Sequence, residues 1–271
     1  MSRREISAAF AAGRVESESH RAVTRLEQLV FPDDVVRLDG VVVAPREPRS
    51  YHLLHKPTGV ITAVRDAMGR VCLDRWLREL EAGTIPVGRL DRDTTGLLLL
   101  TDDGDLAYML IGPAHVPREY RATVEGRVRP DDTRLQALRE GFDIGSGDAR
   151  GHNVRVVSGT AATTSFRLDI DEGRYRQVRR MCRGAGFHLT ALHRTRLGPL
   201  RLGALEPGGM RPLTPDEVGC IWASVGGRAR VHARQRAALR ARLDDDRLDA
   251  ATAARLAAFL DLGEERHGPV S

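Results

Sequence analysis

Apolar residues along this chain occur in short runs separated by polar turns that contain glycine, proline or aspartate, a pattern typical of many short strands. The longest apolar run, 96–100, follows a polar loop directly, and its four consecutive leucines predict a fully buried strand. Shorter runs with apolar alternation or β-branched residues predict further strands at 51–54, 60–64, 120–125, 154–157 and 165–170.

Helices are predicted where apolar residues recur every three or four positions. Leu73, Trp76, Leu77 and Leu80 share one face of a helix over 73–80. Two more helices are predicted at 105–111 and 131–140. Because strands and helices do not alternate regularly, the pattern predicts an α+β fold with a mixed, largely antiparallel sheet and flanking helices, not a doubly wound parallel sheet.

The composition divides the chain into three predicted segments. Residues 1–47 form a small module with a helix at 4–12 and two short strands about the Asp39-Gly40 turn. Residues 48–225 form the main domain, and 226–271 form a helical tail that is rich in arginine and alanine. Six arginines lie between 228 and 242 without an acidic residue. This run has two interpretations, a solvated helical extension or an additional RNA clamp.

The charge of the chain favours an acidic polymer as its partner. The formal net charge is +5, and only Lys56 among the 42 basic residues is a lysine. Arginine offers planar donor groups that bind phosphates and stack on bases, so nucleic acid is the expected partner. No signal peptide, membrane span or nucleotide-binding glycine motif is recognisable, and the three cysteines lack the spacing of zinc ligands. We therefore expect a cytoplasmic protein without a bound metal.

Two polar segments are candidates for chemistry. In 87–96, Asp91 lies on a short loop directly before the predicted buried strand, which would hold the carboxylate rigidly while leaving it open to a cleft. In 171–181, several arginines are three or four residues apart after Gly173. The alternatives are a turn-capping role for Asp91 and a solvated helix face for the arginines.

These two segments carry a resemblance to a known family. Residues 87–105 resemble the catalytic loop of pseudouridine synthases, in the ribosomal RNA branch that includes RsuA, RluB, RluE and RluF. Residues 171–181 resemble the third motif of that family, and His55-Lys56-Pro57-Thr58-Gly59 resembles its first motif. The resemblance covers about residues 50–220. It implies the pseudouridine synthase fold and the isomerisation of a uridine in ribosomal RNA to pseudouridine.

The resemblance also implies roles for single residues. Asp91 corresponds to the catalytic nucleophile, and Arg179, two places after Gln177, to the arginine that pairs with it. Tyr120 matches the active-site tyrosine, whose ring would stack on a flipped-out uracil and whose hydroxyl would take part in proton transfer at C5. A fixed cation beside Asp91 would favour its ionised form in an apolar pocket.

Supporting roles are implied for the remaining basic residues of the motifs. Lys56 would support the catalytic loop, and Arg89 would fill the gap that the flipped base leaves in the RNA. A last set of arginines is expected to contact RNA or to support the loop: Arg174, Arg176, Arg180 and Arg183.

The isomerisation needs no cofactor, since no group is added and no net redox change occurs. The expected partner is ribosomal RNA or a pre-ribosomal particle, bound by a monomer. The sequences 93–96 and 172–175 look more like RsuA, which acts on the small-subunit RNA, than like its large-subunit relatives. This favours the small subunit.

Residues 2–15 resemble the second half of an S4 RNA-binding module, which these synthases often carry at the N-terminus. The usual opening helix and the expected Asn-Gly turn are absent. Two alternatives to the synthase are a non-enzymatic RNA-binding or ribosome-assembly factor on the same fold, and a carboxylate hydrolase. The hydrolase needs a second carboxylate, for which Asp93 is the nearest candidate.

Overall fold

The computed structural model describes residues 3–17, 31, 34–44, 48–112, 114–243 and 249–265. The chain divides into two compact units. Met1–Pro48 together with His232–Ser271 form one, and Arg49–Val231 forms the other, which holds both motif segments. The second unit extends to Val231 because this residue is buried in a core that it shares with Trp222 and Val225.

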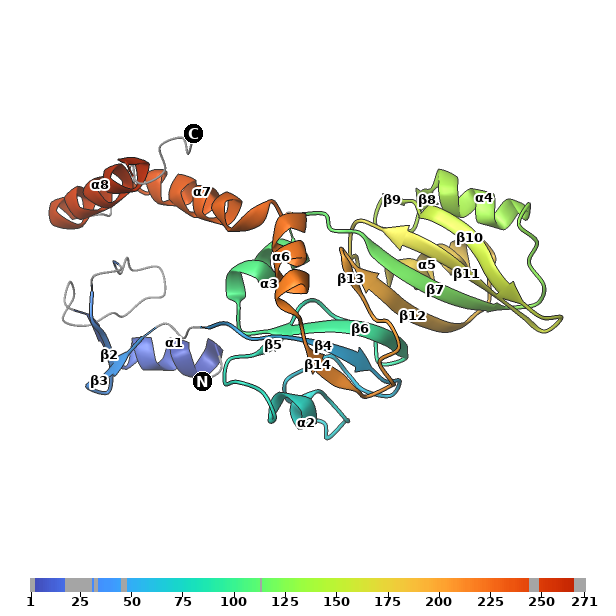
Figure 1. Cartoon of the computed structure of the whole chain (residues 1–271), viewed down its shortest axis with the longest axis horizontal. Helices are drawn as coiled ribbons and strands as arrows, with labels where there is room; N and C mark the ends of the chain where they lie inside the picture. Colours follow the sequence, from blue (N-terminus) through green and yellow to red (C-terminus); the bar gives the residue numbers. More distant parts are fainter. Residues whose placement is uncertain are drawn as a thin grey trace. The chain divides into compact units, whose positions relative to one another are not determined.

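The larger unit is built on one nine-stranded sheet (Figure 1). All its strand pairs are antiparallel except β12–β6, which is parallel. The structure therefore confirms a mixed, largely antiparallel sheet. In spatial order the main strands are β10 (His152–Gly159), β11 (Thr163–Ile170), β7 (Arg118–Glu125), β12 (Leu189–Leu197), β6 (Thr94–Thr101), β4 (Tyr51–Lys56) and β14 (Met210–Pro212), with β13 (Leu200–Arg201) beside β12 and β5 (Ile85–Pro86) beside β6.

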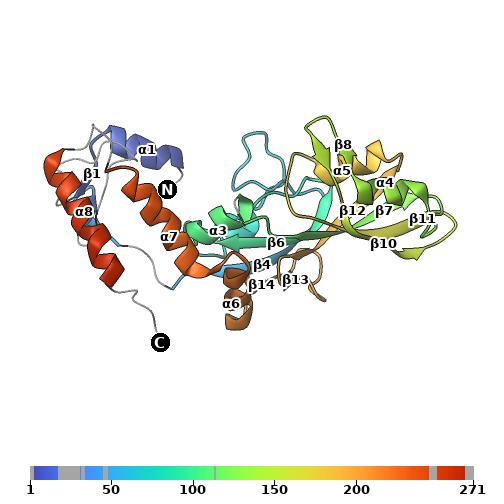
Figure 2. The ribbon, with the colours of Figure 1, turned by 90° about the horizontal axis from the view of Figure 1, so that it is seen from above.

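Helices cover this sheet on both sides, and β6 lies between the two layers. Leu98 and Leu100 belong to one apolar core, and Leu97 and Leu99 belong to the other. The first core includes residues from α2 (Asp74–Leu77), α4 (Thr133–Glu140) and α5 (Gln177–Gly184), and the second from α3 (Gly104–Ile111) and α6 (Pro215–Ser224). Figure 2 shows α4 and α5 on the same side of β7, β10 and β11. Burial on both faces explains why β6 reads as a continuous apolar run.

The smaller unit contains α1 (Arg3–Ala11), the antiparallel strands β1 (Val15–Ser17), β2 (Val36–Leu38) and β3 (Val41–Val43), most of α7 (Gly227–Arg240) and α8 (Ala250–Glu265). The predicted helix at 4–12 and the strand pair about Asp39-Gly40 are confirmed. Leu256 and Leu260 of α8 pack with Phe31, so the two ends of the chain share a small core. The resemblance to an S4 module stays a prediction.

Two predictions of local structure need correction. Residues 60–64 form no strand, because they bond to the neighbouring segment instead: the Ile61 amide donates to Val71 O and the Leu73 amide to Ala63 O. The helix predicted at 73–80 is only Asp74–Leu77, since the next turns tighten to three-residue hydrogen bonds.

One glycine is essential where the halves of the sheet meet. Gly96 pairs with Arg194 at the parallel β6–β12 junction and has a φ of 109°. A Cβ at this position would lie 2.2 Å from Arg194 O. The strands approach too closely there for any side chain.

We predict that Gly96→Ala lowers the free energy of unfolding by about 3 kcal/mol or more, because a strained backbone and a backbone clash add. Gly104→Ala is the matched control, since Gly104 is the first residue of α3 and has open space around it. Urea denaturation measures both. Equal stability of the two variants would contradict the close approach.

Candidate active site

The loop that carries Asp91 is fixed from both sides before it enters β6. The Thr62 hydroxyl donates to Leu90 O at 2.7 Å and accepts from the Leu90 amide at 3.1 Å. The Thr94 amide donates to Asp91 O at 3.1 Å, and the Gly59 amide donates to Arg92 O at 2.8 Å. Asp91 is therefore presented by a rigid turn, while 27% of its side chain stays exposed.

Lys56 lies completely buried beneath this loop. Its ammonium donates to Thr94 O and Pro57 O, both at 2.9 Å, and to Arg92 O at 3.4 Å. Burial lowers the pKa of Lys56 to about 8, although the nearby carboxylates of Asp93 and Asp91 oppose this shift. Three carbonyls converge on one compact donor, a geometry that suits an ammonium better than a planar guanidinium.

Two guanidinium groups flank the Asp91 carboxylate. Arg179 Nε lies 3.3 Å and Arg176 Nη1 lies 3.4 Å from Asp91 Oδ2. Arg179 Nη2 also lies 3.1 Å from Asp93 Oδ1 and donates to the Thr94 hydroxyl at 3.0 Å. The sequence identified Arg179 as the partner of Asp91, and the structure brings these two together. It missed Arg176 as a second partner.

Arg176 reaches Asp91 because its backbone is left-handed, with φ 49° and ψ 34°, directly before α5 begins. Arg176 therefore lies just outside α5, whereas Arg179, Arg180 and Arg183 lie within it. A non-glycine residue pays a conformational cost in this region, and such strain is concentrated at functional sites. Sequence spacing carries no signal for a left-handed arginine.

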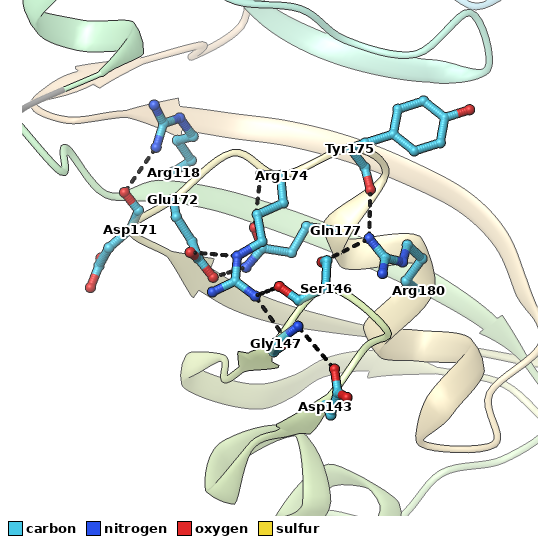
Figure 3. A network of polar contacts seen from close by, with 10 residues as sticks. All are labelled: Arg118, Asp143, Ser146, Gly147, Asp171, Glu172, Arg174, Tyr175, Gln177 and Arg180. Atoms are coloured by element: carbon cyan, nitrogen blue, oxygen red, sulfur yellow. Dashed lines mark hydrogen bonds and ion pairs between the residues drawn. The ribbon is translucent and has the colours of Figure 1, made fainter.

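A polar network holds the arginine segment in place (Figure 3). Arg174 pairs with Glu172 at 2.8 Å and donates to the carbonyls of Ser146 and Gly147, in the hairpin loop between β8 (Phe142–Asp143) and β9 (Asp148–Ala149). Gln177 donates to the same Glu172, and Arg180 donates to Ser146 Oγ. These contacts engage the side chains of Arg174 and Arg180 within the segment and the β8–β9 loop.

The remaining arginines of the prediction are exposed. Arg89 precedes Asp91 by two residues on the same loop, and Arg183 lies in the last turn of α5. No hydrogen bond or ion pair of either side chain is found within the described part of the chain. Tyr175 in the same region is 76% exposed and points away from the network.

A cavity of about 130 Å³ opens beside Asp91. Its apolar wall includes Leu90, Leu192, Leu197 and the ring of Tyr120, which is only 8% exposed. Tyr120 thus lies in the same cavity wall as Asp91 and Arg179, as the motif resemblance implied. A cavity with one apolar, partly aromatic wall and a carboxylate at its edge suits a flat, polar ring.

Sequence reasoning missed two further arginines of this cavity. Arg194 of β12 is 3% exposed, and Arg118 of β7 is 9% exposed. Arg118 donates to the carbonyls of Leu110, Val116 and Asp171. Both occupy inward-facing positions of their strands. Only this position could have identified them from the sequence, because arginine is common throughout the chain.

Among the described residues, no group of three histidine, cysteine or acidic side chains is placed to hold a metal ion. The search of the same residues finds no helix with the length and apolar character needed to cross a membrane.

Comparison with known proteins assigns the class. The family model described as RNA pseudouridylate synthase matches residues 50–183. An uncharacterised RNA pseudouridine synthase of Mycobacterium tuberculosis is 40% identical over 230 residues, covering 83% of this chain and 89% of that protein. The chain belongs to the RNA pseudouridine synthase family, and within it to the RsuA/RluB type.

Further relatives agree with this assignment. A Bacillus subtilis protein named ribosomal large subunit pseudouridine synthase B is 36% identical over 220 residues, covering 80% of this chain and 88% of that one. A crystal structure titled pseudouridylate synthase aligns with a TM-score of 0.57 at 26% identity, covering 82% of this chain and 94% of that chain. The predicted pseudouridine synthase fold is thereby confirmed.

The pKa of Lys56 yields a direct prediction. Because it is the only lysine of the chain, protein labelled with ¹³C at the lysine Cε gives one lysine signal. We expect this signal to titrate near pH 8, and at a lower pH in Asp93→Asn, because that carboxylate raises the pKa. Asp216→Asn is the control, because Asp216 is exposed on α6. A midpoint near the ordinary value of 10.5 would contradict the buried placement.

Proposed function

We propose that this chain isomerises a uridine of ribosomal RNA to pseudouridine, with Asp91 as the nucleophile. The observation that carries the proposal is the position of Asp91: a partly exposed carboxylate, flanked by Arg179 and Arg176, at the edge of a cavity walled by Tyr120. The membership of the chain in the pseudouridine synthase family supplies the reaction type.

The reaction balances without a cofactor. The N1–C1′ bond of uridine breaks, the uracil turns, and a C5–C1′ bond forms; the proton on C5 leaves and N1 gains one. Asp91 faces the ribose and base as the nucleophile, and the two guanidinium groups flank its carboxylate. The Tyr120 ring stacks on the uracil, and its hydroxyl takes part in proton transfer at C5.

The target base must leave the RNA stack to enter the cavity. Arg89, exposed on the loop of Asp91, is suited to fill the gap because a guanidinium plane stacks on neighbouring bases. Arg183, also exposed, is available for a phosphate. Arg174 and Arg180, in contrast, are partly buried and hydrogen-bond to Ser146, so we assign them to support of the loop.

The target RNA that we propose is that of the large ribosomal subunit. Relatives from Bacillus subtilis and Haemophilus influenzae, 36% identical each, carry the name ribosomal large subunit pseudouridine synthase B. These names do not support the preference for the small subunit that the sequences 93–96 and 172–175 suggested. A monomeric, cytoplasmic enzyme acting on RNA or on a pre-ribosomal particle stays a prediction.

The alternative of a non-enzymatic assembly factor has less support. Such a factor has no need for a nucleophile, its cation and a ring wall at one cavity, and Asp91, Arg179 and Tyr120 are all present there. The roles of the 1–47 module and the 226–271 tail in RNA binding stay predictions. Part of the tail is engaged within the protein, since Arg228 lies over the Trp222 ring and donates to the Tyr51 hydroxyl.

We predict that Asp91→Asn lowers turnover at least about 10³-fold, as loss of a nucleophile does, while RNA affinity changes less than about two-fold. The assay is tritium release from a large-subunit ribosomal RNA transcript that carries [5-³H]uridine. Asp93→Asn is the matched control, because Asp93 contacts the same two arginines but is more exposed. It should retain turnover within about ten-fold. Near-normal tritium release by Asp91→Asn would exclude Asp91 as the nucleophile.

A further inference from the structure

Arg194 is a buried cation whose hydrogen-bonding capacity is largely unused. Its Nε donates to Leu97 O at 2.7 Å, and this is the one hydrogen bond of its guanidinium in the described structure. Nη2 is buried without any partner, and no carboxylate pairs with the group in the described residues. Arginine is almost never fully buried unless it is paired, so this arrangement calls for an explanation.

The position of Arg194 supplies that explanation. The residue lies in the wall of the cavity beside Asp91, directly across the strand pair from Tyr120. Arg118 lies in the same wall and is close enough that the charge of Arg194, after burial, helps to lower its pKa. Two like charges are thus buried in the same cavity wall, which favours an electron-rich ligand between or beside them.

We propose that the amino groups of Arg194 donate to a carbonyl oxygen of the flipped-out uracil and thereby select and activate that base. The inference rests on the proposed function and deepens it. A guanidinium has five donors and no acceptor, so it matches the O2 and O4 carbonyls of uracil. Cytosine presents an amino donor where uracil has O4 and therefore meets the guanidinium with a like partner.

The same contact strengthens during the reaction. When the N1–C1′ bond breaks with its electron pair on the base, negative charge spreads from N1 to O2 and O4. A donor fixed in a buried site stabilises such developing charge without reorganisation. The charge is discharged when C5 bonds to C1′, the C5 proton leaves and N1 is protonated.

The test measures coupling between Arg194 and the uracil carbonyls. Transcripts containing 2-thiouridine or 4-thiouridine replace one carbonyl oxygen by sulfur, a weak acceptor. Tritium release from C5 gives kcat/KM for each transcript with the parent protein, Arg194→Met, Arg194→Lys and the control Arg201→Met, whose arginine is exposed on β13. Any intrinsic effect of sulfur is common to all four proteins, so only the ratios between proteins matter.

The sulfur effect is the ratio of kcat/KM for the unmodified transcript to kcat/KM for the thiouridine transcript. We expect this ratio, at one of the two positions, to be about ten-fold larger for the parent and for Arg201→Met than for Arg194→Met. Arg194→Lys keeps the charge and a donor for Leu97 O, so it provides a folded variant if Arg194→Met is unstable. Arg194→Lys should show a smaller sulfur effect than the parent protein. A residue with a merely structural role lowers activity on all transcripts equally.

Equal sulfur effects in all four proteins would overturn the assignment of Arg194 while leaving the synthase intact. Failure of the parent protein to release tritium from unmodified large- and small-subunit ribosomal RNA would instead overturn the proposed function, and this inference with it.

Discussion

The parallel contact of β6 with β12 is the constraint on which this structure depends. Each half of the sheet is antiparallel, and the two halves meet where Gly96 lies against the backbone of Arg194. The contact places the loop of Asp91, just before β6, beside the inward side chains of β12 and β7. The cavity lies at this junction and takes residues from both halves. A side chain at position 96 would separate the halves and open the site.

Electrostatics then determine what the cavity accepts. The carboxylates of Asp91 and the more exposed Asp93 share Arg176 and Arg179, whereas the buried Arg118 and Arg194 face the cavity without a carboxylate partner among the described residues. The interior therefore favours carbonyl oxygens and developing negative charge, and the rim presents the carboxylate of Asp91. Exposed arginines of the same segments, Arg89 and Arg183, carry the positive charge that we propose attracts phosphates of the RNA.

Much of this arrangement could be predicted from the sequence. The leucine run revealed β6, and the polar loop before it revealed Asp91, because both signals are local. The pairing of Asp91 with Arg179 and the placement of Tyr120 came from motif resemblance. The resemblance also implied that Lys56 supports the loop, and its three bonds to carbonyls fit that role.

What the sequence could not predict depends on contacts between distant segments or on backbone geometry. Arg176, the second partner of Asp91, reaches the carboxylate through its own left-handed backbone, which no spacing rule identifies. Arg194 becomes notable only when β12 is paired with β6 and β7. Residues 60–64 have the composition of a strand, but their backbone hydrogen bonds go to the loop segment 71–73 and not to a strand of the sheet. A single sequence does not reveal which of these partners the backbone takes.

The most direct test of the account is a map of pseudouridine in ribosomal RNA from cells with and without the gene. The account predicts that one position in the large-subunit RNA loses pseudouridine without the gene. The parent protein restores this pseudouridine, and the Asp91→Asn protein does not. Identical maps from both kinds of cell would contradict the claim that this chain modifies ribosomal RNA.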